Sequence, residues 1–139
     1  MKPYMLDTNI CSFIMRVHPP QVLQHLGRAR REGRLITISA VAYVEMLYGA
    51  ISPKASPKLL PGLKSFVRRL GGIAVLDANT VEKGAEIRRE LLKKGTPIGQ
   101  NDSLIAAHVI TSGSILITNN MREFARVPGL DVQDLVQAH

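Results

Sequence analysis

Three stretches of the sequence place a carboxylate shortly after an apolar run, where a helix is expected to begin. Asp7 follows the run 4–6 and is succeeded by two residues that can cap a helix, and Glu45 and Asp102 follow later runs in the same order. One such Asp is ordinary, because turns and caps favour this residue. Three in one chain indicate a shared site, since open α/β sheets bind ligands at the carboxyl ends of their strands.

Acids brought together without a cation would repel and raise one another's pKa values, so the set favours a bound ion. Carboxylate oxygens suit Mg²⁺ or Mn²⁺. Zinc is disfavoured because no His or Cys pair has ligand spacing, and His108, six residues after Asp102, is expected to be a surface or core histidine. A hydrated Mg²⁺ can activate water for phosphodiester hydrolysis. The glycine-rich phosphate loops of nucleotide-binding proteins are absent from the sequence.

The composition favours a polyanionic partner. Eighteen Lys and Arg against eleven Asp and Glu give a formal charge of +7, which suits nucleic acid, an anionic surface or an acidic protein. Aromatic residues make up only 4% and Trp is absent, so a stacking platform of the kind single-strand binders use is not expected. With 139 residues and 45% hydrophobic content, the chain is expected to form one domain, 1–139.

Cysteine usage and the apolar runs favour a cytoplasmic protein. Cys11 is the only cysteine and lies inside an apolar helical pattern, so it is expected to be a buried thiol and no disulfide can form within one chain. The N-terminal apolar run is brief, and none approaches the ~18 residues that would span a bilayer. Neither export nor membrane insertion is predicted.

Apolar runs and helical patterns alternate along the chain. This order predicts an α/β fold with a parallel sheet covered by helices. The strands are expected at 4–6, 35–38, 73–76 and 114–118, with a short edge strand within 127–132, and the helices at 9–16, 21–34, 39–48, 62–70, 81–94 and 104–111.

Two helical patterns carry apolar stripes expected to be buried. Val41, Val44 and Tyr48 share one face with Glu45 on a helix that Ser39 caps and Gly49 closes. A carboxylate in that company would lose hydration and need a cation, unless it only rims the face and reaches solvent. Asp77 is expected to be a cap or turn residue. The helix 81–94 carries its apolar residues at Val81, Ala85, Ile87, Leu91 and Leu92.

In a parallel sheet, Asp7, Asp102 and Asn120 would converge on the carboxyl edge, with Glu45 reaching it from the flank of a helix. Arginines elsewhere are open to two interpretations. They could bind phosphates flanking the metal site, or form solvated helix ends that suit the helix dipole. The candidates for substrate binding are Arg28, Arg31, Arg68 and Arg69.

Four sequence blocks resemble the motifs of PIN-domain ribonucleases, specifically the VapC toxins of type II toxin-antitoxin (VapBC) systems. They are MLDTNICSFIM, ISAVAYVEMLYGA, GTPIGQNDSLIAAH and ILITNNMREF, in the family's order over nearly the whole chain. The resemblance implies a three-layer α/β/α sandwich around a short parallel sheet. It also implies a Mg²⁺-dependent endoribonuclease toxin, with Mn²⁺ as a substitute, that cleaves structured RNA, often tRNA. Family members are commonly homodimeric and inhibited by a cognate VapB antitoxin.

By the same resemblance, Asp7, Glu45 and Asp102 take the places of the family's three metal-binding acids. Many PIN domains have a fourth acid where this chain has Asn120, so one metal or two stays open. Asn120 could ligate through its oxygen or orient a water, and Glu123 could supply the missing charge. Thr8, Asn9 and Thr118 match positions that support the metal site. The alternative is a non-catalytic PIN-like RNA-binding or scaffold module in which the acids serve as caps.

Overall fold

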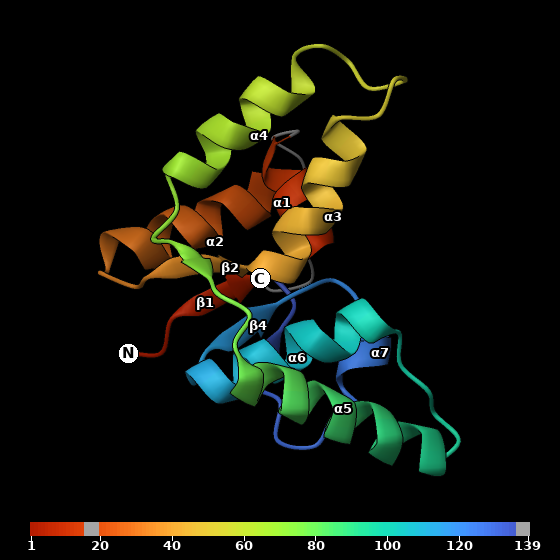
Figure 1. Cartoon of the computed structure of the whole chain (residues 1–139). Coiled ribbons are helices and arrows are strands. Elements are labelled where there is room, and N and C mark those ends of the chain that lie inside the picture. Colours follow the sequence, from red (N-terminus) through yellow and green to blue (C-terminus); the bar gives the residue numbers. More distant parts are fainter. Residues whose placement is uncertain (16–19, 136–139) are drawn as a thin grey trace.

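The computed structural model describes residues 1–15 and 20–135, and it has helices on both sides of one sheet (Figure 1). The strands are β1 (Tyr4–Leu6), β2 (Ile36–Ser39), β3 (Ile73–Ala74), β4 (Ile115–Ile117) and β5 (Val132–Gln133). The helices are α1 (Thr8–Met15), α2 (Pro20–Arg31), α3 (Ala40–Ala50), α4 (Leu59–Arg68), α5 (Ala78–Lys93), α6 (Gln100–Ser112) and α7 (Met121–Phe124). Arg16, the predicted last residue of the first helix, lies outside the described residues.

The strands form one parallel sheet in the order β3-β2-β1-β4-β5. Leu6, in the centre of this sheet, is in register with Ile38 and Ile117. Asp7 and Thr118 directly follow Leu6 and Ile117, so they leave the sheet at the same edge. The register therefore places Asp7, near the start of the chain, beside Thr118, near its end, as the strand-helix alternation predicts.

Each face of the sheet carries its own hydrophobic core, which makes the fold a three-layer α/β/α sandwich. Successive residues of β1 alternate between the faces, with Met5 in one core and Leu6 in the other. The Met5 side packs against α5 and α6, and the Leu6 side packs against α1, α2 and α4 (Figure 1). Buried Cys11 belongs to the Leu6 side, which confirms its prediction as a core thiol.

Helix α3 begins as predicted but differs in its end and in its exposed side. The Ser39 side chain accepts the backbone N–H of Val41, so Ser39 is the cap. Gly49 lies inside α3 and does not close it, which was predicted wrongly. Val44 and Tyr48 are 63% and 71% exposed, so the stripe expected to be buried faces solvent at these positions.

Helix α5 likewise has two apolar sides, and only one is buried. Ile87 and Leu91 lie in the core, whereas Val81 and Leu92 are 47% and 56% exposed. Sequence periodicity does not distinguish the buried apolar side from the exposed one, because residues of the two sides alternate along the same helix. Asp77 caps α5 by accepting the backbone N–H of Thr80 at 2.9 Å, which confirms its prediction as a cap.

Candidate active site

Asp7 lies at the carboxyl edge of the sheet, between β1 and α1. Its backbone N–H donates to the carbonyl of Ile117 at 2.9 Å, which extends the pairing of β1 with β4 by one residue. Its two carboxylate oxygens accept from the Thr8 backbone N–H and the Thr118 hydroxyl, each at 2.8 Å. Burial raises the pKa of Asp7, these two hydrogen bonds oppose the rise, and Glu123 adds to it. The carboxylate is thus held firmly in a dry position.

Glu45 reaches the same edge from α3. Its Oε1 accepts from the Thr8 hydroxyl at 3.5 Å, the outer limit of a hydrogen bond. The side chain is half-buried, and burial followed by the charge of Asp7 raises its pKa. Thr8 therefore contacts both acids, through its backbone to Asp7 and through its hydroxyl to Glu45. The half-buried side chain lies between the two alternatives, since the stripe expected to bury it is exposed at Val44 and Tyr48.

Asp102 lies in the first turn of α6, where the positive end of the helix dipole favours an ionised carboxylate. Its pKa is nevertheless raised to about 7, first by burial and then by the charges of Glu123 and Asp7. A hydrogen bond with Glu123 and the charge of Glu45 contribute further. Burial and the surrounding acids together therefore outweigh the helix dipole, and all four carboxylates share one electrostatic environment.

Thr118 and Asn120 connect β4 to the acids. The Thr118 hydroxyl, while donating to Asp7, accepts the backbone N–H of Asn120 at 2.9 Å. The side-chain amide of Asn120 donates to Glu123 Oε2 at 3.0 Å. Glu123, one turn into α7, is in turn bonded to Asp102. The amide therefore ties Glu123 into the cluster, at the position where many relatives are expected to have a fourth acid.

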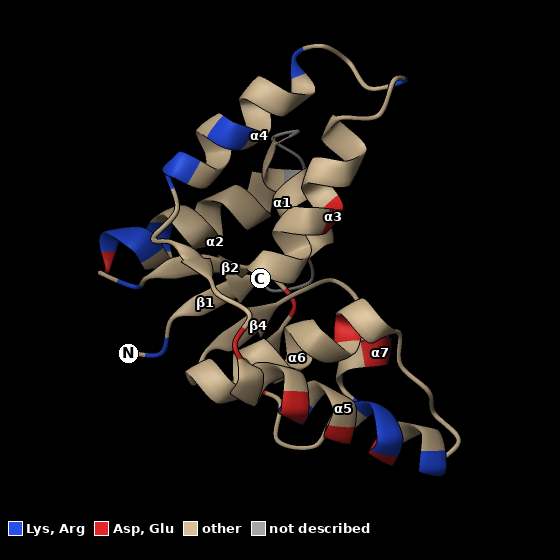
Figure 2. Ribbon diagram, in the orientation of Figure 1, with Lys and Arg blue, Asp and Glu red and all other residues tan. Residues whose placement is uncertain are grey.

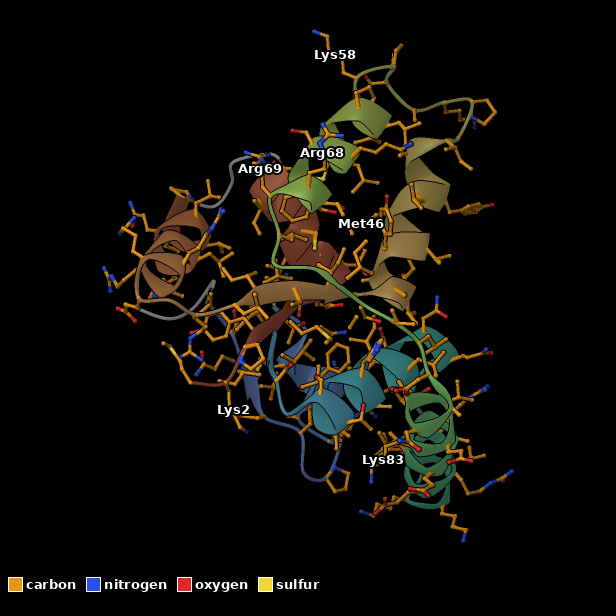
Figure 3. All side chains as sticks on the ribbon, turned by 60° about the vertical axis from the view of Figure 1, so that its left-hand side comes forward. Lys2, Met46, Lys58, Arg68, Arg69 and Lys83 are labelled. Atoms are coloured by element: carbon orange, nitrogen blue, oxygen red, sulfur yellow. The ribbon has the colours of Figure 1, made fainter. Side chains whose placement is uncertain are left out.

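The remaining predicted site residues lie outside this cluster. Asn9 is exposed in the first turn of α1. The four candidate arginines, Arg28, Arg31, Arg68 and Arg69, belong to the ends of α2 and α4. These helix ends lead into the first residues of β2 and β3, so the arginines lie at the amino edge of the sheet, opposite the acids. Figure 2 shows Lys and Arg gathered on α2 and α4, and Figure 3 shows Arg68 and Arg69 at the end of α4.

Two other arginines, which the sequence reasoning missed, lie closer to the acids. Arg122 and Arg126 flank Glu123 on and just after α7. Arg126 donates to the carbonyl of Glu123 and to the carbonyl of Pro97, both at 3.3 Å, and so joins α7 to the segment before α6. The i, i+4 spacing of Arg122 and Arg126 was visible in the sequence, but the position of α7 at the acid cluster was not.

The donor set fits a hard divalent cation. It offers carboxylate, amide and hydroxyl oxygens, and within residues 1–15 and 20–135 no ion pair joins Asp7, Glu45, Asp102 or Glu123 to a basic side chain. In the same part of the chain, no three Asp, Glu, His or Cys side chains lie close enough together to coordinate one ion without rearrangement. Binding would therefore require at least one acid to change rotamer, and Glu45 is the less buried of the two acids, Asp7 and Glu45, that Thr8 contacts.

Sequence comparison identifies the family. A PIN-domain family model matches residues 4–130. The tRNA(fMet)-specific endonuclease VapC of Salmonella typhimurium is 37% identical over 139 residues, covering 96% of this chain and 98% of its own length. The chain belongs to the VapC family of PIN-domain ribonucleases. Ribonuclease VapC2 of Rickettsia felis is also 37% identical and covers 94% of this VapC chain and 96% of its own length.

Solved VapC structures share the fold. The DNA-bound VapBC complex of Salmonella typhimurium matches with a TM-score of 0.86 at 34% identity, covering 97% of this chain and 99% of that one. VapBC2 of Rickettsia felis, bound to a promoter DNA fragment, matches with a TM-score of 0.85 at 36% identity, covering 94% and 97%. The chain is thus a VapC ribonuclease toxin of the VapBC toxin-antitoxin class. None of the helices that the structure describes has the length and apolar character needed to cross a bilayer.

Proposed function

We propose that the protein is a Mg²⁺-dependent endoribonuclease toxin in which Asp7, Glu45 and Asp102 hold the metal, with Mn²⁺ as a substitute. One arrangement carries this proposal: Asp7, Glu45, Asp102 and Glu123 gather at the carboxyl edge of the sheet without a basic partner among the described residues, and this proximity, with burial, raises the pKa of Asp102 to about 7. A set of like charges without a basic partner among the described residues is costly, and a divalent cation removes that cost. When bound, the ion lowers the pKa of a coordinated water and stabilises charge on the leaving oxygen.

The residues around the acids have distinct tasks in this proposal. Thr118 and the backbone of Thr8 fix the Asp7 carboxylate, and the Thr8 hydroxyl steadies Glu45. Asn120 holds Glu123 beside Asp102, so Glu123 supplies the fourth negative charge without a fourth acid at position 120. Because position 120 carries an amide and not a fourth metal-binding acid, we propose that the site holds one ion tightly. Asn9 is exposed beside Thr8 and is assigned a contact to substrate or to coordinated water.

RNA, with tRNA as the favoured class, is the proposed substrate. The chain's charge of +7 suits a polyanion, and one of its relatives is named a tRNA(fMet)-specific endonuclease. Arg122 and Arg126 flank the acids and are assigned flanking phosphates. Arg28, Arg31, Arg68 and Arg69 lie at the opposite edge of the sheet, so an RNA that contacts them must wrap around the domain. A cytoplasmic location follows from a tRNA substrate.

A cavity on the basic side of the molecule is proposed to receive the cognate VapB antitoxin. Its volume is about 730 Å³, and it lies among α1, α2, α4 and the start of β2. Leu23, Leu26 and Phe66 provide apolar lining, while Arg30, Arg34 and Arg69 add positive charge. This chemistry fits an apolar peptide segment carrying acidic side chains. Arg30→Glu should weaken VapB binding and leave RNA cleavage by the free toxin intact.

A homodimer is proposed through the outer side of α5. Val75, Leu76, Val81 and Leu92 are large apolar side chains left exposed on this helix and the segment before it. Glu82 near the beginning of the helix and Arg89 near its end would face each other in an antiparallel pair. Leu92→Asp should convert the dimer to a monomer in light-scattering measurements.

The experiment that tests the function measures cleavage of a panel of purified RNAs, tRNAs included. The wild type should cleave with Mg²⁺ or Mn²⁺ and stop with EDTA, and Asp102→Asn should be inactive while binding RNA as well as or better than the wild type. Asp77→Asn is the matched control, because Asp77 also follows a strand but only caps α5. Cleavage that persists in EDTA would reject the proposal. Binding of RNA without cleavage of any of it would favour the non-catalytic module instead.

A further inference from the structure

His108 is a buried histidine that the proposed site does not use. It lies on α6 with 3% of its surface exposed. One ring nitrogen, Nε2, is 2.8 Å from the backbone carbonyl of Val75. The other, Nδ1, is 2.8 Å from the hydroxyl of Ser39, which is itself fully buried. The ring therefore joins α6 to the ends of two strands.

The partners define the direction of each hydrogen bond for the neutral ring. The Val75 carbonyl can only accept, so Nε2 carries the proton and donates it. Nδ1 then accepts from the Ser39 hydroxyl, whose oxygen in turn accepts the backbone N–H of Val41 at 3.1 Å. Every polar group in this chain of bonds has a partner. Loss of one member would leave a buried polar group unpaired.

Two of the connected elements, α3 and α6, carry acids of the site. Ser39 ends β2, begins α3 and is in register with Ala74 at the end of β3, one residue before Val75. Along α3, Glu45 comes six residues after Ser39, and along α6, Asp102 comes six residues before His108. At about 1.5 Å per residue, each acid is about 9 Å along its helix from the Ser39–His108 contact. This contact is the hydrogen-bonded junction between the helix of Glu45 and the helix of Asp102.

We infer that His108 is a positioning residue that, through Ser39, sets the separation between Glu45 and Asp102. The inference rests on the proposed function, because the separation matters for holding a shared cation. Each acid lies about 9 Å along its helix from the contact, so a tilt of one helix by about 6° would displace its acid by about 1 Å. A displacement of that size is enough to disturb metal binding or catalysis. The core contacts of α3 with α6 hold the helices together, and the hydrogen bonds fix their angle.

Two substitutions separate the two ring contacts. In His108→Asn, the side-chain oxygen replaces Nδ1 as acceptor for Ser39 and the bond to Val75 is lost. In His108→Gln, the side-chain amide replaces Nε2 as donor to Val75 and the bond to Ser39 is lost. Ser39→Ala removes the same bond from the other side, together with the cap of α3. Thr80→Val is the matched control, because Thr80 is equally buried and its hydroxyl bonds Thr111 of α6 at 3.2 Å, away from the acids.

The readouts are Mn²⁺ affinity by calorimetry without RNA, the thermal unfolding temperature, and the metal dependence of cleavage. His108→Gln and Ser39→Ala should bind Mn²⁺ about 10- to 100-fold more weakly, as expected for residues that orient metal ligands. Excess Mn²⁺ should restore much of their cleavage rate. His108→Asn should bind Mn²⁺ more tightly than His108→Gln, and Thr80→Val should lower the unfolding temperature without changing Mn²⁺ affinity.

Unchanged Mn²⁺ affinity in His108→Gln, with an unfolding temperature lowered as in Thr80→Val, would overturn the inference and leave His108 a packing residue. If His108→Gln does not fold, His108→Leu, which also removes the bond to Ser39 but keeps the cap of α3, takes its place in the comparison with Thr80→Val. A wild type that binds no Mn²⁺ would instead overturn the proposed function, and the inference with it.

Discussion

Thr118 donates its hydroxyl to Asp7 at 2.8 Å, so residues 111 positions apart in the chain share one buried hydrogen bond at the edge of the sheet. The bond follows from the register of β1 with β4, which aligns Leu6 with Ile117 and places the next residue of each strand side by side. It opposes the rise in the pKa of Asp7 that burial causes. The strand pairing thus helps to keep a dry carboxylate ionised.

Thr118→Val should therefore weaken metal binding although Thr118 carries no charge. Removal of the hydroxyl raises the pKa of Asp7 further and frees its carboxylate to rotate, so Mn²⁺ affinity at neutral pH should fall about 10- to 100-fold. Thr118→Ser keeps the hydroxyl and should bind Mn²⁺ nearly as the wild type does. Equal Mn²⁺ affinities for the Val and Ser variants, measured by calorimetry, would contradict this role.

The pH dependence of metal binding should report Asp102. Because its pKa is about 7, Mn²⁺ affinity should rise with pH through this value as the carboxyl loses its proton. Glu123→Gln removes the neighbouring charge that raises the pKa of Asp102 most, so the rise in Mn²⁺ affinity should move to lower pH. Calorimetric titrations from about pH 5.5 to about pH 8.5 measure both curves. A midpoint that does not move in Glu123→Gln would show that Glu123 does not act on Asp102.

The metal-free protein should lose stability as the pH rises from 3.8, the ordinary pKa of an aspartate, to about 7. In that window the folded state keeps the Asp102 proton that the unfolded state releases, so folding becomes less favourable as pH increases. Mg²⁺ at 100 times its Kd should add about 2.7 kcal/mol to the free energy of unfolding at neutral pH. Urea unfolding with and without Mg²⁺ measures both effects. Stability that rises with pH without metal would contradict the account.

Asn120→Asp should change the number of metal ions bound. The amide of Asn120 now pairs with Glu123, and a carboxylate in its place would add a fifth acid that a second cation must neutralise. Mn²⁺ titration should then give two sites per chain, where the wild type gives one. Asn119→Asp is the control, since it adds the same charge at the neighbouring exposed position and should leave the stoichiometry at one.

Local sequence signals were sufficient for the order of elements and for the N-terminal caps of two helices. Strand-helix alternation predicted the parallel sheet, and Ser39 and Asp77 were identified as cap residues, although α5 begins at Ala78 and not at the predicted Val81. The position of Asp7 followed from the same logic, because a residue directly after a strand must lie at its carboxyl edge. These features depend only on residues that are neighbours in the chain, so they can be predicted from a single sequence.

Features that depend on packing partners were not predictable in the same way. Val44, Tyr48 and Leu92 fit a buried helical stripe, but the periodicity of one chain does not show which of two apolar sides meets the core. The bond of Glu123 with Asp102 requires the tertiary position of α7. The arginines at the ends of α2 and α4 could have been located from strand direction alone, since a helix that leads into a strand ends at the amino edge.

The central claim is that Asp7, Glu45 and Asp102 hold one divalent cation between them. A crystal structure with Mn²⁺, in which anomalous scattering locates the ion, tests it most directly. The account predicts one peak in contact with carboxylate oxygens of all three residues, and no peak at that place in Asp102→Asn. A wild-type structure in saturating Mn²⁺ with no ion among these acids, or with the ion bound elsewhere, would contradict it.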